Sequence, residues 1–239
     1  MLYTLSVLAM FKNESMIIQE WINHYIEEGV EHFYLIDNGS TDNYYEKIKM
    51  YEKYFTLVKD STRLPRSGTQ TYLYNKIPDV LNKLPLHIEK IWLPWKNFGS
   101  NGHQIQPSNI IQSFIKMGTN MDKKKGEGKV IVKTENLIEI ETAGHKVKLS
   151  KNDIYYNING DILDKFIVTH ETCATFNLHI NHYRTMSEEY YKKVKCTRGG
   201  GEYGLNNRYK PDYIKNLDKN YNQIVDNELY NKKKLNIKQ

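Results

Sequence analysis

Residues 33–42 read Phe33-Tyr34-Leu35-Ile36-Asp37-Asn38-Gly39-Ser40-Thr41-Asp42, an apolar run that ends in a dense polar turn. Such a run is typical of a buried parallel strand, and the turn residues predict a loop at its carboxyl end. An earlier apolar run, Tyr3 to Phe11, ends in Lys12-Asn13-Glu14. Because ligands of open parallel sheets bind beyond the carboxyl ends of the strands, both polar ends are candidate binding loops.

The segments between these strands have helical periodicity. From Ser15 to Glu28 the apolar residues recur at spacings of three and four, and Gly29 stands where a glycine commonly follows a helix. Tyr44 to Tyr54 is predicted as a second helix, and Phe55 to Lys59 as a third strand. This β-α-β-α-β order predicts an α/β fold, with a mostly parallel sheet flanked by helices.

Patterns in the remaining sequence are weaker. They predict a helical fragment at 70–75, one or two helical turns at 78–84, a strand at 88–94, a helix at 107–116, a hairpin of 130–133 with 137–141, a strand at 174–182 and a helix at 187–195 capped by Ser187. We expect one domain over 1–210, with a nucleotide-binding part (1–60), an irregular acceptor and C-terminal part (88–201), and a peripheral polar helical tail (211–239).

Composition narrows the classes of function. The net charge of +6 is mild for 239 residues, and neither a zinc-finger spacing nor an aromatic RNA-binding motif is present. The triplets Lys123–Lys125 and Lys232–Lys234 are explained by a solvated loop and tail. The mild charge and the absence of these motifs predict that nucleic acid is not a partner. The N-terminal apolar run is short and has no basic leader, so the sequence predicts a cytoplasmic protein with no membrane span.

The loop that begins at Asp37 has groups suited to a nucleotide. Its carboxylate can accept hydrogen bonds from a uracil N3–H or from ribose hydroxyls, and Gly39 allows close approach of the backbone. Ser40, Thr41 and Asp42 can cap the next helix, whose N-terminus favours phosphate oxygens. The alternative is that this stretch is only a loop and a helix cap.

Several blocks together resemble the family 92 glycosyltransferases and their family 2-like relatives, which have the A-type, Rossmann-like glycosyltransferase fold. They occur in the order of the family: Phe11-Lys12-Asn13-Glu14, Glu20-Trp21-Ile22-Asn23-His24-Tyr25, Gly29-Val30, Phe33 to Asp42, Trp95 to His103, Ile180-Asn181-His182-Tyr183, Ser187-Glu188-Glu189-Tyr190, Lys193 and Arg198-Gly199.

The resemblance implies that a sugar is transferred from a nucleotide sugar, often UDP-galactose, to a hydroxyl of a glycan or glycoprotein. It implies nucleotide-sugar binding by Lys12, Asn13, Glu14, Asp37, Asn38, Gly39, Ser40 and Asp42. A divalent cation, Mn²⁺ or Mg²⁺, would bridge the diphosphate, with His182 as a candidate ligand. A carboxylate would serve as general base, but the sequence does not identify it.

The later blocks supply candidates for contact with the acceptor or the diphosphate: Trp95, Phe98, Gly99, Ser100, His103, His182, Lys193 and Arg198. Trp95 and Phe98 could stack on an acceptor sugar, whereas the alternative places them in the core. Packing or surface positions are equally ordinary explanations for a single histidine or for a helix lysine such as Lys193.

The sequence departs from the family at its metal motif. No Asp-x-Asp occurs in the 239 residues, and the acidic strand expected between Asn75 and Ile77 has no counterpart. Lys59, Arg63, Arg66 and Lys76 lie near this gap and could supply countercharge. Two functions therefore stay open: an active transferase, or a catalytically impaired or inactive relative that binds a nucleotide or glycan.

Overall fold

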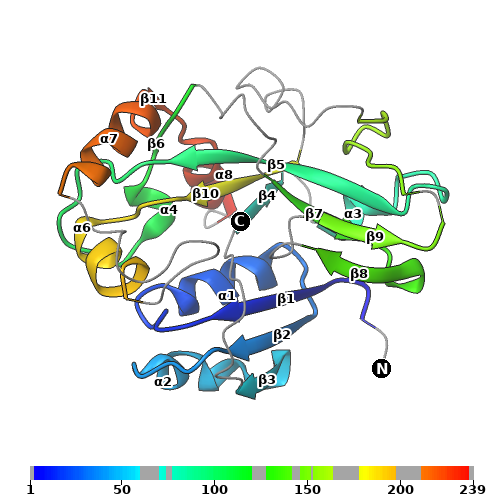
Figure 1. The fold of residues 1–239 in the computed structure, drawn as a ribbon, viewed down its shortest axis with the longest axis horizontal. Helices are drawn as coiled ribbons and strands as arrows, with labels where there is room; N and C mark the ends of the chain where they lie inside the picture. Colours follow the sequence, from blue (N-terminus) through cyan, green and yellow to red (C-terminus); the bar gives the residue numbers. More distant parts are fainter. Residues whose placement is uncertain are drawn as a thin grey trace.

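The computed structural model describes residues 3–59, 70–73, 77–119, 128–141, 146–151, 153–163, 178–197 and 211–236. Helices and strands are mixed, and the described strands form a three-stranded sheet, a six-stranded sheet and a separate pair (Figure 1). The predicted α/β class is therefore confirmed. In the described part of the chain, no helix has the length and apolar character needed to cross a membrane.

The first sheet is parallel and follows the predicted β-α-β-α-β order. Its strands are β1 (Ser6–Phe11), β2 (His32–Asp37) and β3 (Phe55–Lys59), and the connections contain α1 (Ile18–Glu27), α2 (Tyr44–Ile48) and the 3₁₀-helix η1 (Lys49–Tyr54). After α1, Gly29 takes the left-handed conformation with φ of 93°, as expected of a glycine that ends a helix. The register pairs Phe11 with Asp37, so the two candidate loops begin side by side.

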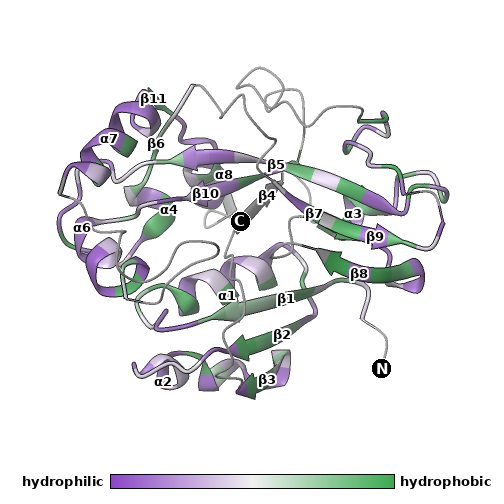
Figure 2. Cartoon of the chain, in the orientation of Figure 1, coloured by the Kyte–Doolittle hydropathy of each residue, from purple (hydrophilic) through white to green (hydrophobic). Residues whose placement is uncertain are grey.

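One face of this sheet forms a core with the helices, because side chains alternate between the two faces of a strand. The buried members of this cluster are Phe11, Ile18, Ile22, Tyr25, Val30, Phe33, Leu35, Tyr44 and Ile48. The opposite face is partly open, since Leu8, Tyr34 and Val58 are 58%, 44% and 52% exposed. Figure 2 shows the apolar character of β1 and β2 along the sheet.

The second sheet is built around β5 (Lys90–Phe98), in which every residue is buried. β10 (Leu178–Tyr183) pairs with β5 in parallel. The other pairings are antiparallel: β4 (Gln70–Leu73) with β10, β6 (Lys116–Met117) with β5, β7 (Gly128–Val132) with β5, and β11 (Ile224–Val225) with β6. The expectation of a mostly parallel sheet therefore holds for the first sheet and fails for the second.

Several predicted elements differ from the structure. Residues 70–73 form β4 instead of a helical fragment, because pairing with β10 outweighs weak local propensity. The expected hairpin of 130–133 with 137–141 does not form: β7 pairs with β5, and β8 (Leu137–Glu141) pairs with β9 (Lys146–Leu149). The helix expected at 107–116 is reduced to α4 (Ile110–Ser113). Further short helices are α3 (Ile77–Leu81), η2 (Thr134–Asn136), α6 (Glu188–Tyr190) and η4 (Tyr191–Lys195).

The C-terminal segment is helical, as predicted, but it is not peripheral. It contains α7 (Pro211–Tyr221), β11 and α8 (Glu228–Asn236). β11 adds a strand to the second sheet, and the buried Lys96 ammonium pairs with Asp226 at 2.8 Å and with Glu228 at 3.0 Å. From α8, Lys232 pairs with Glu28 at 2.9 Å. These contacts make the segment part of the packed structure.

Candidate functional site

The two candidate loops are joined to each other beyond the carboxyl ends of β1 and β2. The Asn13 amide donates to Ser40 Oγ at 3.0 Å, and the Thr41 amide donates to Asn13 Oδ1 at 2.7 Å. The Ser15 amide donates to Asp42 Oδ2 at 2.8 Å. Since every one of these bonds crosses between the loops, residues 12–15 and 37–42, here called the paired loops, form one unit.

Backbone geometry in the paired loops is unusual at two positions. Asn13 has a φ of 55° and Gly39 a φ of 74°. Glycine takes this conformation without a steric penalty, whereas asparagine is one of the few other residues that tolerate it. Sparsely populated backbone conformations are concentrated at functional sites, where surrounding contacts hold them in place.

Asp37 organises the second loop from a buried position. Its carboxylate accepts from the Ser40 amide at 2.8 Å and from the Tyr44 hydroxyl at 2.9 Å, and the residue is only 4% exposed. Burial, followed by the hydrogen bond to Asp37, raises the pKa of the Tyr44 phenol. The direct contact with base or ribose implied for Asp37 therefore does not fit this geometry, and its carboxylate positions Ser40 and Tyr44.

Glu14 connects the paired loops to a distant part of the chain. The Tyr190 hydroxyl donates to the Glu14 carboxylate, and both residues are buried. Burial and then the negative charge of Asp42 raise the pKa of the Tyr190 phenol. Tyr190 ends α6 (Glu188–Tyr190), whose N-terminus Ser187 caps as predicted by accepting from the Tyr190 amide. In Figure 1, α6 accordingly lies at the end of the molecule where α1 begins.

The exposed groups of the paired loops suit an anionic, hydroxyl-bearing ligand. Lys12, Asn13, Ser40 and Asp42 are partly exposed and Thr41 is exposed, whereas Asn38 is buried. An ammonium and two hydroxyls can donate to phosphate oxygens, and an acidic side chain can accept from sugar hydroxyls. The predicted phosphate-binding helix N-terminus is less suitable, because α2 has only five residues and its Asn43 cap makes no side-chain hydrogen bond.

A second group of predicted residues lies on β5 and β10. The ring of His182 stacks on Trp95, with centroids 4.1 Å apart, and His182 Nδ1 lies 2.7 Å from Asn97 Oδ1. Trp95 is 6% exposed, which fits the alternative of a core position and leaves little of its ring for stacking on a sugar. In the part of the chain that the structure describes, no three His, Cys, Asp or Glu side chains come together as metal ligands. The described surroundings of His182 therefore do not fit the expected cation.

The segment after β5 is held by α7 and by Asn222, the residue that follows α7. The Ser100 amide donates to Asp218 Oδ1 at 2.7 Å, and a Cβ on Gly99 would meet Asn222 Oδ1 at 2.3 Å. Phe98 is 1% exposed in the core, and His103 Nε2 lies 2.8 Å from the Ser113 carbonyl oxygen. Phe98, Gly99, Ser100 and His103 are thus structural here, because packing against α4, β6 and α7 occupies the groups expected to meet a ligand.

The last two candidates have different outcomes. Lys193 is exposed and pairs with Glu189 at 2.6 Å. Arg198 lies outside the described residues. Sequence reasoning missed Tyr44 and Tyr190, because the neighbouring residues do not indicate which carboxylate each hydroxyl contacts. Tyr190 does stand inside the block Ser187-Glu188-Glu189-Tyr190.

Comparison with known proteins bears on the paired loops directly. Residues 3–70 match the family model of glycosyltransferase family 92. The match covers the whole β1-α1-β2-α2-β3 unit and both loops, and it confirms the family 92 resemblance over that range. No curated protein and no solved structure matched the chain. The match of residues 3–70, here called the family 92 segment, supports the function of a glycosyltransferase.

Proposed function

We propose that the paired loops of the family 92 segment bind the nucleoside diphosphate of a nucleotide sugar, and that the chain transfers the sugar to a hydroxyl of a glycan or glycoprotein. One observation carries the proposal. Two loops at the ends of adjacent parallel strands are joined by hydrogen bonds, and Lys12, Ser40 and Thr41 stay at least partly exposed. Ligands of open α/β sheets bind beyond such strand ends.

The loop residues have separate tasks in this proposal. Lys12 places a positive charge beside the phosphates, and the Ser40 and Thr41 hydroxyls donate to phosphate or sugar oxygens. Asp37 keeps Ser40 in place through the Ser40 amide, and Asn13 keeps Thr41 in place through the Thr41 amide. Pre-organised donors of this kind reduce the ordering cost of binding.

The proposed donor is a UDP-hexose such as UDP-galactose, as the family resemblance suggests. A divalent cation, when bound, would neutralise the departing diphosphate. The described residues do not fit such an ion, so the proposal rests on Lys12 and the loop hydroxyls.

Calorimetry with UDP tests the binding step. The unaltered chain should bind UDP, and Lys12→Gln should weaken binding by about tenfold, the effect of losing one charge-assisted contact. Lys47→Gln, at an exposed position of α2, is the matched control and should bind UDP normally. Absence of UDP binding by the unaltered chain would contradict the proposal.

A second candidate function is a nucleotide- or glycan-binding relative without turnover. The observation that favours it is that Glu14 and Asp37, two acidic residues of the paired loops, are both buried and hydrogen-bonded inside the protein. Neither is placed to take a proton from an acceptor hydroxyl. Release of UDP from UDP-galactose, followed over time, separates the two candidates: binding without release supports this second one.

A further inference from the structure

Glu14, in the first of the paired loops, is fixed by two different parts of the chain. Its carboxylate accepts a hydrogen bond from the Tyr190 hydroxyl, and its carbonyl oxygen accepts from the Ile17 and Ile18 amides, each at 2.9 Å. The two backbone bonds lead directly into α1. Glu14 is therefore held by the helix that it precedes and by a side chain 176 positions away.

Asn13, directly before Glu14, joins this fixed residue to the second loop. Its amide donates to Ser40 Oγ at 3.0 Å, and its side-chain oxygen accepts from the Thr41 amide at 2.7 Å. Its φ of 55° lies in the left-handed region, and such a conformation persists where surrounding contacts hold it. A shift of Glu14 would move the backbone of Asn13, and the bonds to Ser40 and Thr41 would move with it.

Tyr190 is itself held in place, because α6 is bonded to the segment that follows β5. The Glu188 amide donates to the His103 carbonyl oxygen at 3.0 Å, and the Glu189 amide donates to the Gln104 carbonyl oxygen at 2.9 Å. In Figure 1, the arrows of β1, β5 and β10 point to the side of the molecule where α6 lies. This short helix is therefore a fixed support from which the buried Tyr190 hydroxyl reaches the paired loops.

A purely structural role is the alternative for the bond between Tyr190 and Glu14, since a buried carboxylate needs a donor wherever it lies. The position of the acceptor favours a role in ligand binding as well. Glu14 is next to the positive-φ residue Asn13, from which Ser40 and Thr41 are held. Pre-organised donors lower the ordering cost of binding, so this bond should affect affinity and not stability alone.

We infer that Tyr190 is a positioning residue of the nucleotide site. Its hydroxyl holds Glu14, and Glu14 holds the backbone of Asn13. Ser40 and Thr41 are thereby kept where they can meet the ligand. The inference rests on the proposed function, and it gives Glu14 a positioning role in place of the direct ligand contact that the family resemblance implies.

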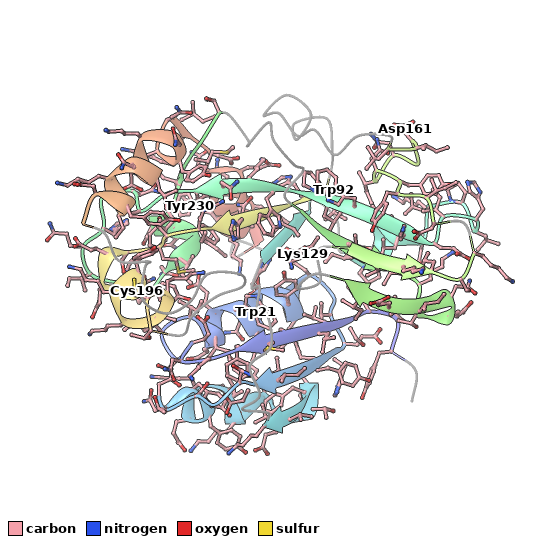
Figure 3. The ribbon with its side chains drawn as sticks, viewed as in Figure 1. Trp21, Trp92, Lys129, Asp161, Cys196 and Tyr230 are labelled. Carbon is pink, nitrogen blue, oxygen red and sulfur yellow. The ribbon has the colours of Figure 1, made fainter. Side chains whose placement is uncertain are left out.

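Calorimetry with UDP tests the inference through Tyr190→Phe. That variant should bind UDP about fivefold more weakly, because part of the loop must then be ordered on binding. Asn157→Ala is the control for lower stability, since it removes the acceptor of the Asn159 and Asp161 amides. Figure 3 labels Asp161 far from α1 and α2, so this control should bind UDP as the unaltered chain does.

Two variants of Glu14 test the same bond from its other side and stay informative if Tyr190→Phe does not fold. Glu14→Gln keeps an acceptor for the Tyr190 hydroxyl and should bind UDP within about twofold of the unaltered chain. Glu14→Ala removes the acceptor and should bind UDP about fivefold more weakly. Combining Glu14→Ala with Tyr190→Phe should add little further loss, because both changes remove one bond.

The amide signal of Thr41 measures the positioning without any ligand. In Tyr190→Phe this signal should shift and the amide should exchange faster with solvent, because its bond to Asn13 Oδ1 is loosened. In Asn157→Ala the signal and its exchange rate should match those of the unaltered chain. An unchanged Thr41 amide in Tyr190→Phe would overturn the inference.

The binding outcomes separate this inference from the proposed function. If Tyr190→Phe binds UDP normally while Lys12→Gln does not, the inference is overturned and the proposed function stands. A loss in Asn157→Ala equal to that in Tyr190→Phe would show a general effect of lower stability and overturn the inference. A loss in Glu14→Gln equal to that in Glu14→Ala would overturn it too. If the unaltered chain does not bind UDP, both proposals fail.

Discussion

The hydroxyl of Tyr190 donates a hydrogen bond to the carboxylate of Glu14 across 176 positions of the chain. Glu14 belongs to the loop after the first strand, and Tyr190 ends a helix of the C-terminal half. This buried contact is the point at which the family 92 segment is joined to α6. The shape of the paired loops therefore depends on residues far outside the segment that the family model matches.

Tyr190→Phe should destabilise the protein, because it removes the donor that satisfies a buried carboxylate. We expect the free energy of unfolding to fall by about 1–3 kcal/mol, measured by urea denaturation. Tyr45→Phe is the matched control, since the Tyr45 hydroxyl donates to Glu52 in an exposed position. That variant should unfold at the same urea concentration as the unaltered chain. If both variants had the same free energy of unfolding, the buried hydrogen bond would contribute no more to stability than the exposed one.

Asn13 has two measurable roles, a positive φ and an acceptor for the Thr41 amide. Asn13→Ala loses the acceptor and keeps a steric penalty, so it should cost about 2 kcal/mol of stability. Asn13→Gly loses only the acceptor and should cost about 1 kcal/mol. Thermal unfolding of both variants provides the comparison. A glycine variant less stable than the alanine variant would exclude backbone strain at this position.

The buried Lys96 holds the C-terminal segment through ion pairs with Asp226, whose side chain is 10% exposed, and with Glu228, whose side chain is 38% exposed. Lys96→Met leaves the largely covered Asp226 carboxylate without this cation and should reduce the free energy of unfolding by about 3–5 kcal/mol. The double change Lys96→Met with Asp226→Leu should recover much of that loss. Lys49→Met, which breaks an exposed pair with Glu46, should change little.

The same ion pairs predict an effect of acid on stability. Burial raises the pKa of Asp226, but the charge of Lys96 and its hydrogen bond outweigh burial and hold that pKa below the ordinary 3.8. The stability contributed by ionised Asp226 is therefore present above pH 3.8 and lost as the pH falls further. In urea denaturation at a series of acidic pH values, Lys96→Met should lack this component of the loss.

Lys129 predicts a pH dependence at the alkaline end. Burial lowers the pKa of its ammonium to about 8, from an ordinary value of 10.5. Between these values the unfolded chain binds more protons, so the contribution of Lys129 to stability rises with pH. Lys129→Met should be more stable than the unaltered chain at pH 7 by roughly 2 kcal/mol, and the difference should shrink towards pH 10. Figure 3 labels Lys129, which lies on β7 beside Trp95.

Urea denaturation at pH 7, 8, 9 and 10 measures this difference. Lys133→Met, at the exposed far end of the same strand region, is the control and should show no such convergence. A difference that is constant with pH, or a less stable Lys129→Met at pH 7, would contradict the assignment of burial as the cause.

The N-terminal fold follows from local sequence, and the rest does not. Apolar periodicity at 15–28 and polar turns at 12–14 and 37–42 are local signals, and each strand of the first sheet pairs with its neighbour in the chain order. In the second sheet, β4 pairs with β10 and β11 pairs with β6, both across more than a hundred residues. No local pattern specifies such partners.

The candidate site shows the same division. The turn that begins at Asp37 was recognisable, but the burial of its carboxylate depends on the Tyr44 hydroxyl and could not be inferred from the turn itself. Similarly, Trp95 resembles a stacking residue in sequence, whereas its place in the core depends on β10. Residue type identified the loops, and tertiary pairing decided which of their groups are available.

The central proposal is that the paired loops bind a nucleoside diphosphate. NMR titration of the ¹⁵N-labelled chain with UDP tests it most directly. The amide signals of Asn13, Ser40 and Thr41 should shift in a saturable manner, while those of the distant Asn157–Asp161 turn stay unchanged. Saturable shifts confined to other parts of the chain, or no shifts at millimolar UDP, would contradict the account.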